Sequence, residues 1–195
     1  MPLLDPAASL LVVIDVQERY LPHLFEGARV VEACRRLIAG ATRVGVPLLL
    51  TEQYPKGLGH TAAALRTALP PGSVAIEKSS LSCLGCAAFA ERLRASGRRQ
   101  VVVAGIEAHA CVSQTAHELL AAGYEVHLPI DALSARFRRD YDVACRRLER
   151  DGAIPTTVEA VLLEWVRTAE SPHFQAMREL IRDPLPGSDE DASAP

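Results

Sequence analysis

The chain has 195 residues, of which 49% are hydrophobic and 23% are charged, and its formal charge is -3. A chain of this length suits one domain with a substantial buried core. The 21 basic and 24 acidic residues include no basic block, which argues against nucleic acid as a partner. No run of ~18 uncharged apolar residues occurs, so the sequence predicts no membrane span and no membrane partner.

Short apolar runs alternate with segments of helical periodicity along the chain. Six apolar runs are expected strands, at 10–14, 47–50, 74–76, 101–104, 126–130 and 153–156. The expected helices lie between and after them, at 28–44, 84–96, 109–122, 137–150, 158–167 and 173–181. Because strand and helix alternate with short links, the pattern predicts an α/β fold of three layers, α/β/α, around a central, mostly parallel six-stranded sheet.

Two long loops and a terminal tail interrupt this alternation. Residues 16–27 and 53–73 follow the first and second strands, and long loops at the carboxyl ends of strands commonly build sites. Residues 184–195 are Pro-rich and then acidic. We therefore expect one domain over residues 1–183 and a disordered or loosely attached tail over 184–195.

The cysteines and the first residues bear on the compartment in which the protein works. Five cysteines are an odd number, and their spacing is not that of a small disulfide scaffold. Residues 1–15 lack the basic region and the small-residue cleavage site of a signal peptide, and they run directly into the first strand. We expect a cytoplasmic protein with reduced thiols.

Three polar residues follow expected strands at the edge of the sheet where α/β proteins bind ligands. Asp15 ends the first strand, Lys78 follows the third, and Cys111 lies in the first turn of the helix after the fourth. A helix start favours a thiolate and can bind an oxyanion, so Cys111 is a candidate nucleophile. Each residue alone also has a structural interpretation: Asp15 as a cap, Lys78 as a solvated strand end, and Cys111 as a buried packing thiol.

No metal or cofactor motif accompanies these candidates. The six histidines do not fall at metal-ligand spacings, and Cys83 and Cys86 form a lone CxxC that we interpret as packing thiols. Glu52 and Asp131 also end strands, and either could be a plain cap. Glycine-rich phosphate-binding loops are absent. The sequence therefore predicts no metal site and no cofactor.

Four segments of the chain, in this order, resemble the isochorismatase-like cysteine hydrolase superfamily, and the resemblance covers about residues 8–183. They are LLVVIDVQERYLP with Asp15, TEQYPKGLG at 51–59, IEKSSLSC with Lys78, and GIEAHACVSQTAHELLAAGYEVHLPIDALSAR with Cys111. The second and fourth look most like the isochorismatase domain-containing subgroup. The resemblance implies a Rossmann-like, isochorismatase-like hydrolase fold and assembly into a homo-oligomer, either a dimer or a larger ring.

The resemblance also implies a catalytic triad. Asp15 would act as general base, Lys78 would hold Asp15 and favour the thiolate, and Cys111 would attack a carbonyl carbon to give a covalent thioester. A non-proline cis peptide bond is implied at 106–107, with the backbone N–H groups of Glu107 and Cys111 forming the oxyanion hole. Contacts with a small-molecule substrate are expected from the two long loops, at Gln17, Tyr20, Leu24 and Tyr54.

Two departures from the superfamily pattern narrow the expected activity. The Asp-x-His metal motif of its nicotinamidases is replaced here by EQYPKGLGH, which argues against a metal and against that activity. Isochorismatases proper lack the nucleophilic cysteine that this chain has at position 111. We therefore expect metal-independent hydrolysis of a small amide or related C–N bond. The main alternative is a non-catalytic binding or scaffold protein; a thiol-redox protein and a Rossmann cofactor binder lack their motifs.

Overall fold

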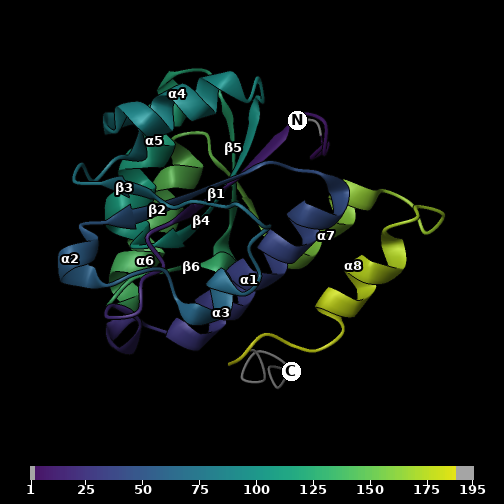
Figure 1. Ribbon diagram of the computed structural model, residues 1–195, viewed down its shortest axis with the longest axis horizontal. Helices are drawn as coiled ribbons and strands as arrows, with labels where there is room; N and C mark the ends of the chain where they lie inside the picture. Colours follow the sequence, from purple (N-terminus) through teal and green to yellow (C-terminus); the bar gives the residue numbers. More distant parts are fainter. Residues whose placement is uncertain (1–2, 188–195) are drawn as a thin grey trace.

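The computed structural model describes residues 3–187, and a parallel sheet runs through the middle of the fold (Figure 1). Within these residues the sheet has seven strands, of which six follow the order β3-β2-β1-β4-β5-β7 while β6 pairs with β4. Every pairing is parallel. The strands are β1 (Ser9–Ile14), β2 (Leu48–Gln53), β3 (Ile76–Lys78), β4 (Gln100–Ile106), β5 (Glu125–Pro129), β6 (Leu133–Ser134) and β7 (Ile154–Thr156). The predicted fold class is confirmed.

The number of strands and several strand boundaries differ from the prediction. The expected sheet had six strands; the seventh is β6, whose two residues pair with Gly105 and Ile106. A two-residue strand is too short to produce an apolar run. The third strand was expected at 74–76, but β3 includes Lys78, which pairs with Gln53. Backbone pairing with β2 therefore sets the end of β3, and the apolar pattern does not.

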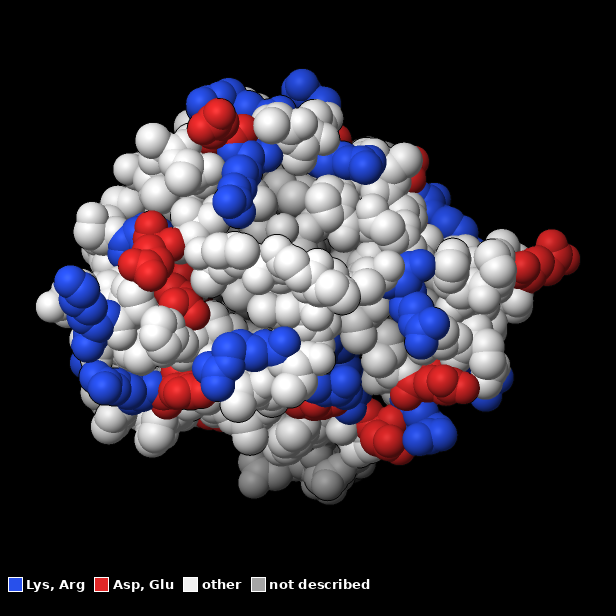
Figure 2. Space-filling model, in the orientation of Figure 1, with Lys and Arg blue, Asp and Glu red and all other residues white. Residues whose placement is uncertain are grey.

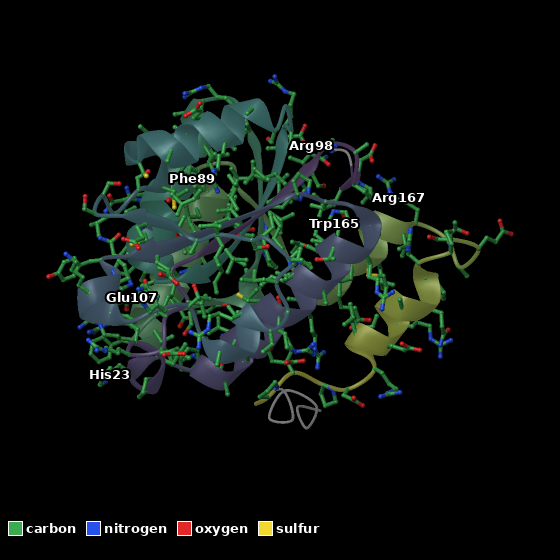
Figure 3. All side chains as sticks on the ribbon, in the orientation of Figure 1. His23, Phe89, Arg98, Glu107, Trp165 and Arg167 are labelled. Atoms are coloured by element: carbon green, nitrogen blue, oxygen red, sulfur yellow. The ribbon has the colours of Figure 1, made fainter. Side chains whose placement is uncertain are left out.

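Helices cover both faces of the sheet. One face carries α1 (Gly27–Val44), α3 (Ala63–Arg66), α7 (Val158–Val166) and α8 (Phe174–Ile181), and the other carries α4 (Ala87–Ala95), α5 (Ser113–Ala121) and α6 (Arg138–Arg150) (Figure 1). Figure 3 labels one large side chain in each layer, Trp165 on α7 and Phe89 on α4. Because both faces are covered, all six residues of β1 are buried. Each buried leucine there contributes about 2 kcal/mol.

The strand order reverses between β1 and β4. From β1 the chain continues to β2 and β3 on one side, whereas β5 and β7 follow on the far side of β4. At the carboxyl end of this junction Ile14 pairs with Gly105, which has a φ of 114°. A Cβ atom at Gly105 would lie 2.1 Å from the Ile14 carbonyl oxygen, so this close approach requires glycine. The peptide bond between Ile106 and Glu107 is cis, as the resemblance implies.

The two long loops contain short helical turns. Residues 16–27 include the 3-10 turn η1 (Leu21–His23), and residues 53–73 include α2 (Pro55–Leu58) and α3. The start of the expected tail is attached, since Arg36 donates to the carbonyl oxygens of Asp183 and Pro184. Residues 188–195 of that tail lie outside the described residues. Within residues 3–187, no helix is both long and apolar enough to cross a bilayer.

The buried thiols predict a loss of stability at alkaline pH. Burial raises the pKa of Cys34 from 9.0 to about 12, while an unfolded thiol keeps its ordinary value. Between these pH values the unfolded state binds fewer protons, so the free energy of unfolding falls by up to about 1.4 kcal/mol per pH unit for one such group. Urea unfolding from pH 8 to 11 should therefore show a shallower decline in Cys34→Ala than in the wild type. The same slope in both proteins would contradict this assignment.

Candidate functional site

A buried ion pair joins the ends of β1 and β3. Lys78 Nζ lies 2.7 Å from Asp15 Oδ2, and both side chains are almost fully buried. Burial lowers the pKa of Lys78, but the charge and hydrogen bond of Asp15 outweigh it, so the pKa is raised overall. Asp15 has a φ of 52°, which turns the chain out of the sheet directly after β1. Desolvating such a pair costs several kcal/mol, which makes it a candidate functional feature as well as a structural one.

Cys111 lies beside this pair. It belongs to a π-helical turn, η3 (Ala108–Val112), that follows β4 and leads into α5, and it is 7% exposed. The charges of Asp15 and Lys78 both act on the Cys111 thiol. Burial and the Asp15 carboxylate raise the pKa of Cys111 to about 12, although Lys78 opposes them. Burial and the charge of Asp15 therefore oppose the thiolate that the helix start and Lys78 were expected to favour.

Strand β2 contributes two side chains to this cluster that the apolar pattern did not identify. Thr51 Oγ1 donates to Asp15 Oδ1 at 2.7 Å, and Gln53 Oε1 accepts from Lys78 Nζ at 2.7 Å. Both were missed because the apolar run predicted that this strand ends at residue 50, whereas β2 continues to Gln53. Residues 51 and 53 point to the same face of β2, which lies between the strands that lead to Asp15 and Lys78. This spacing is the signal that could have revealed Thr51 and Gln53.

Glu107 links three segments at the same end of the sheet. Its buried carboxylate accepts hydrogen bonds from the Tyr20 hydroxyl and from the backbone N–H of Arg136, and the Arg136 Nε lies 3.4 Å away. Burial and Glu107 raise the pKa of Tyr20 to about 12. The Cys111 sulfur also acts electrostatically on Tyr20, which places this phenol near the thiol. Figure 3 shows Glu107 at the same end of the molecule as His23 of η1.

The other expected substrate contacts lie in different environments. Gln17 is fully buried; its amide donates to the carbonyl oxygens of Gln53 and Gly59 and accepts from the Gln53 N–H. This arrangement uses the Gln17 side chain to hold the two long loops together. Leu24 is half-buried against the core beneath α1, and Tyr54 is 60% exposed. Of the four candidates, Tyr20 is the one that is bonded to Glu107.

Two further carboxylates at strand ends have structural partners. Glu52 accepts from the N–H and hydroxyl of Thr61 and contacts His60, and Asp131 accepts from the N–H of Val158 at the start of α7. Both act as caps of loop or helix backbone. Within residues 3–187, no three His, Cys, Asp or Glu side chains converge in a way that would hold a metal ion.

A cavity of about 590 Å³ lies elsewhere, between α1, α6 and α7. Its lining includes Arg29, Asp131 and Tyr141 but none of Asp15, Lys78 and Cys111. The guanidinium of Arg29 is already bonded to the carbonyl oxygens of Asp131 and Leu133. The candidate site is therefore defined by the cluster of reactive groups at the reversal of strand order, where open parallel sheets bind ligands.

The fold and this cluster define the class: a three-layer α/β protein whose reactive groups gather at the carboxyl ends of β1, β3 and β4. Residues 9–160 match the family described as "Isochorismatase domain". The chain belongs to this family, as the sequence resemblance implied, and the family supports a hydrolase role.

Relatives cover most of the chain. Isochorismatase domain-containing protein 1 of Danio rerio is 37% identical over 185 residues, which are 95% of this chain and 65% of the relative. Isochorismatase domain-containing protein 2 of Homo sapiens is 35% identical over 184 residues, 94% of this chain and 87% of that protein. The chain thus spans 65% of the length of the first of these relatives.

Solved structures agree on the fold. A structure described as MAR1 ribonuclease from Caenorhabditis elegans has a TM-score of 0.91 and 34% identity, covering 100% of this chain and 98% of the other. The Escherichia coli YcaC gene product, described as an octameric hydrolase of unknown specificity, has a TM-score of 0.83 and 20% identity, with the same coverage of 100% and 98%. At 20% identity, this second likeness bears on the fold alone.

Proposed function

We propose that this protein is a metal-independent cysteine hydrolase that cleaves a C–N bond in a small amide or related molecule. Cys111 is the nucleophile, Asp15 the general base, and Lys78 the cation that holds Asp15. The observation that carries the proposal is the buried cluster of all three groups: Lys78 lies 2.7 Å from Asp15, and the charges of both act on the buried Cys111 thiol.

The raised pKa of Cys111 defines how the nucleophile is activated. With a thiol pKa of about 12, loss of the proton to solvent is negligible near neutral pH. Transfer to Asp15 keeps the total charge of the buried cluster constant, because a carboxylate and thiol become a carboxylic acid and thiolate beside Lys78. The sulfur attacks the carbonyl carbon while the thiol proton moves to Asp15.

The remaining steps return every proton. The tetrahedral oxyanion is held by the backbone N–H groups of Glu107 and Cys111. As the C–N bond breaks, Asp15 gives its proton to the departing nitrogen and leaves a thioester on Cys111. Asp15 then takes a proton from water, the hydroxide adds to the thioester, and the sulfur leaves and regains the proton from Asp15. The products are a carboxylic acid and an amine or ammonia.

The substrate class is tested with a panel of small amides, ureas and carbamates, using wild type beside Cys111→Ala. We expect at least one compound to be hydrolysed by the wild type, with turnover absent in Cys111→Ala. Because a structural relative is described as a ribonuclease, a short RNA is included. Cleavage of RNA alone would replace the amidase proposal, and silence across the panel would favour the non-catalytic scaffold.

We further propose a cytoplasmic homo-oligomer that binds no nucleic acid. On the face shown in Figure 2, basic and acidic side chains are interspersed, in keeping with the nearly balanced charge. The proposal of assembly rests on the sequence resemblance. Light scattering on the purified chain should give a mass at least twice that of the 21.0 kDa protomer.

A further inference from the structure

Strand β2 lies between the two strands that carry the ion pair. The sheet order β3-β2-β1 places Lys78 and Asp15 on opposite sides of it, with Ile14 in register with Thr51 and Gln53 in register with Lys78. The Asp15 N–H also donates to the Thr51 carbonyl oxygen at 3.2 Å. Thr51 therefore contacts Asp15 through both its backbone and its side chain.

The direction of the Thr51 hydrogen bond follows from the Asp15 carboxylate, whose oxygens accept hydrogen bonds. The Thr51 hydroxyl therefore gives its one proton to Asp15 Oδ1. The Cys83 thiol, in the 3-10 turn η2 (Cys83–Gly85), lies 3.9 Å from the oxygen of that hydroxyl and donates to it. All three side chains are buried, which keeps water from competing for these bonds.

The two oxygens of Asp15 are held differently. Oδ2 accepts from Lys78, whose ammonium has further oxygen acceptors in Gln53, Ser80 and Leu81. Oδ1 accepts from Thr51, the side-chain hydroxyl that contacts it among the described residues. Loss of Gln53 leaves Lys78 with other acceptors, whereas loss of the Thr51 hydroxyl leaves Oδ1 without this donor.

We propose that Thr51 is a positioning residue that orients the Asp15 carboxylate for proton transfer from Cys111. This inference rests on the proposed function, because it assigns Asp15 the role of base. The charged and titratable groups that face Asp15 are Lys78 from β3, Cys111 from η3 and Cys83 from η2. Lys78 holds the position of one oxygen, and Thr51 determines the rotation of the carboxylate about that contact.

The test is the rate at which iodoacetamide modifies Cys111, followed by peptide mapping from pH 4 to 9. In the proposed mechanism Asp15 accepts the proton of the thiol as the sulfur is alkylated, so this rate depends on the orientation of the Asp15 carboxylate. Thr51→Val removes the donor at nearly constant volume, so the whole profile should shift to rates lower by about threefold or more. Thr51→Ser keeps the hydroxyl and should restore the wild-type profile.

Two controls separate this effect from a general loss of packing. Thr42→Val removes a hydroxyl that bonds within α1 to the Ile38 carbonyl, and it should leave the profile unchanged. Asp15→Asn should alter the profile of Cys111 more than any Thr51 variant. Should Thr51→Val fail to fold, the smaller Thr51→Ala carries the same expected shift.

The outcomes distinguish the inference from the function on which it rests. A Thr51→Val profile that coincides with the wild type, while Asp15→Asn differs, would overturn the role of Thr51 and leave the proposed function standing. A wild-type profile in Asp15→Asn would remove Asp15 as the base and with it both proposals. A shift in Thr51→Val that Thr51→Ser fails to reverse would show a packing effect and would also overturn the inference.

Discussion

Replacing Asp15 by Asn is expected to lower kcat by about 10²- to 10⁴-fold on any substrate that the wild type hydrolyses, the usual range for loss of a general acid–base group. The amide has nearly the shape of the carboxylate but cannot take the proton of Cys111, whose pKa of about 12 prevents ionisation to solvent near neutral pH. Asp15 also serves the departing nitrogen and the attacking water, so its loss affects both halves of the reaction.

The fold should survive this substitution. Lys78 keeps the oxygens of Gln53, Ser80 and Leu81 as acceptors, so its ammonium does not become a bare buried charge. Circular dichroism and a thermal melt check that the variant is folded, and Asp140→Asn on the surface of α6 serves as the matched control. Wild-type turnover in a folded Asp15→Asn variant would eliminate Asp15 as the base.

Replacing Gly105 by Ala should strongly destabilise the protein. The added Cβ would lie 2.1 Å from the Ile14 carbonyl oxygen and 2.7 Å from the Ile14 nitrogen, at a backbone φ of 114°. β1 and β4 would have to separate at the point where Asp15 and Glu107 leave the sheet. Because backbone strain and overpacking add, we expect the free energy of unfolding to fall by about 3 kcal/mol or more and Tm to decrease by roughly 10 °C.

Gly97→Ala provides the matched control for this effect. Gly97 also has a positive φ, of 65°, but a Cβ there would meet no atom within 4 Å. Gly97→Ala therefore measures backbone strain without the clash, and we expect it to lower the free energy of unfolding by about 1 kcal/mol. Thermal melts of the two variants that agree within error would contradict the proposed steric role of Gly105.

The positions of the reactive groups were accessible from the sequence because they depend on strand ends. The β1 run LLVVI and the run before Lys78 are apolar, and parallel strands bring their carboxyl ends to one edge. This was enough to bring Asp15 and Lys78 to one place, and they are in contact. The resemblance turned Cys111 from a candidate into the expected nucleophile, and it implied the cis bond before Glu107, which the structure contains.

Other features depend on three-dimensional contacts that apolar patterns do not encode. Thr51 and Gln53 were missed because the pairing of β2 with β3 continues past the last leucine of the run. Gln17 was interpreted as a substrate contact, but its amide is bonded to loop backbone. The raised pKa of Cys111 comes from burial and from Asp15, and both depend on how distant segments of the chain pack together.

The central claim is that catalysis proceeds through an acyl group on Cys111. The most direct measurement is acid quenching of the wild type during turnover of a hydrolysed amide, followed by intact-mass analysis and peptide mapping. We predict a mass increase equal to the acyl part of the substrate, located on the peptide that contains Cys111 and absent from Cys111→Ala. Acylation of another residue, or full turnover by Cys111→Ala, would contradict the account.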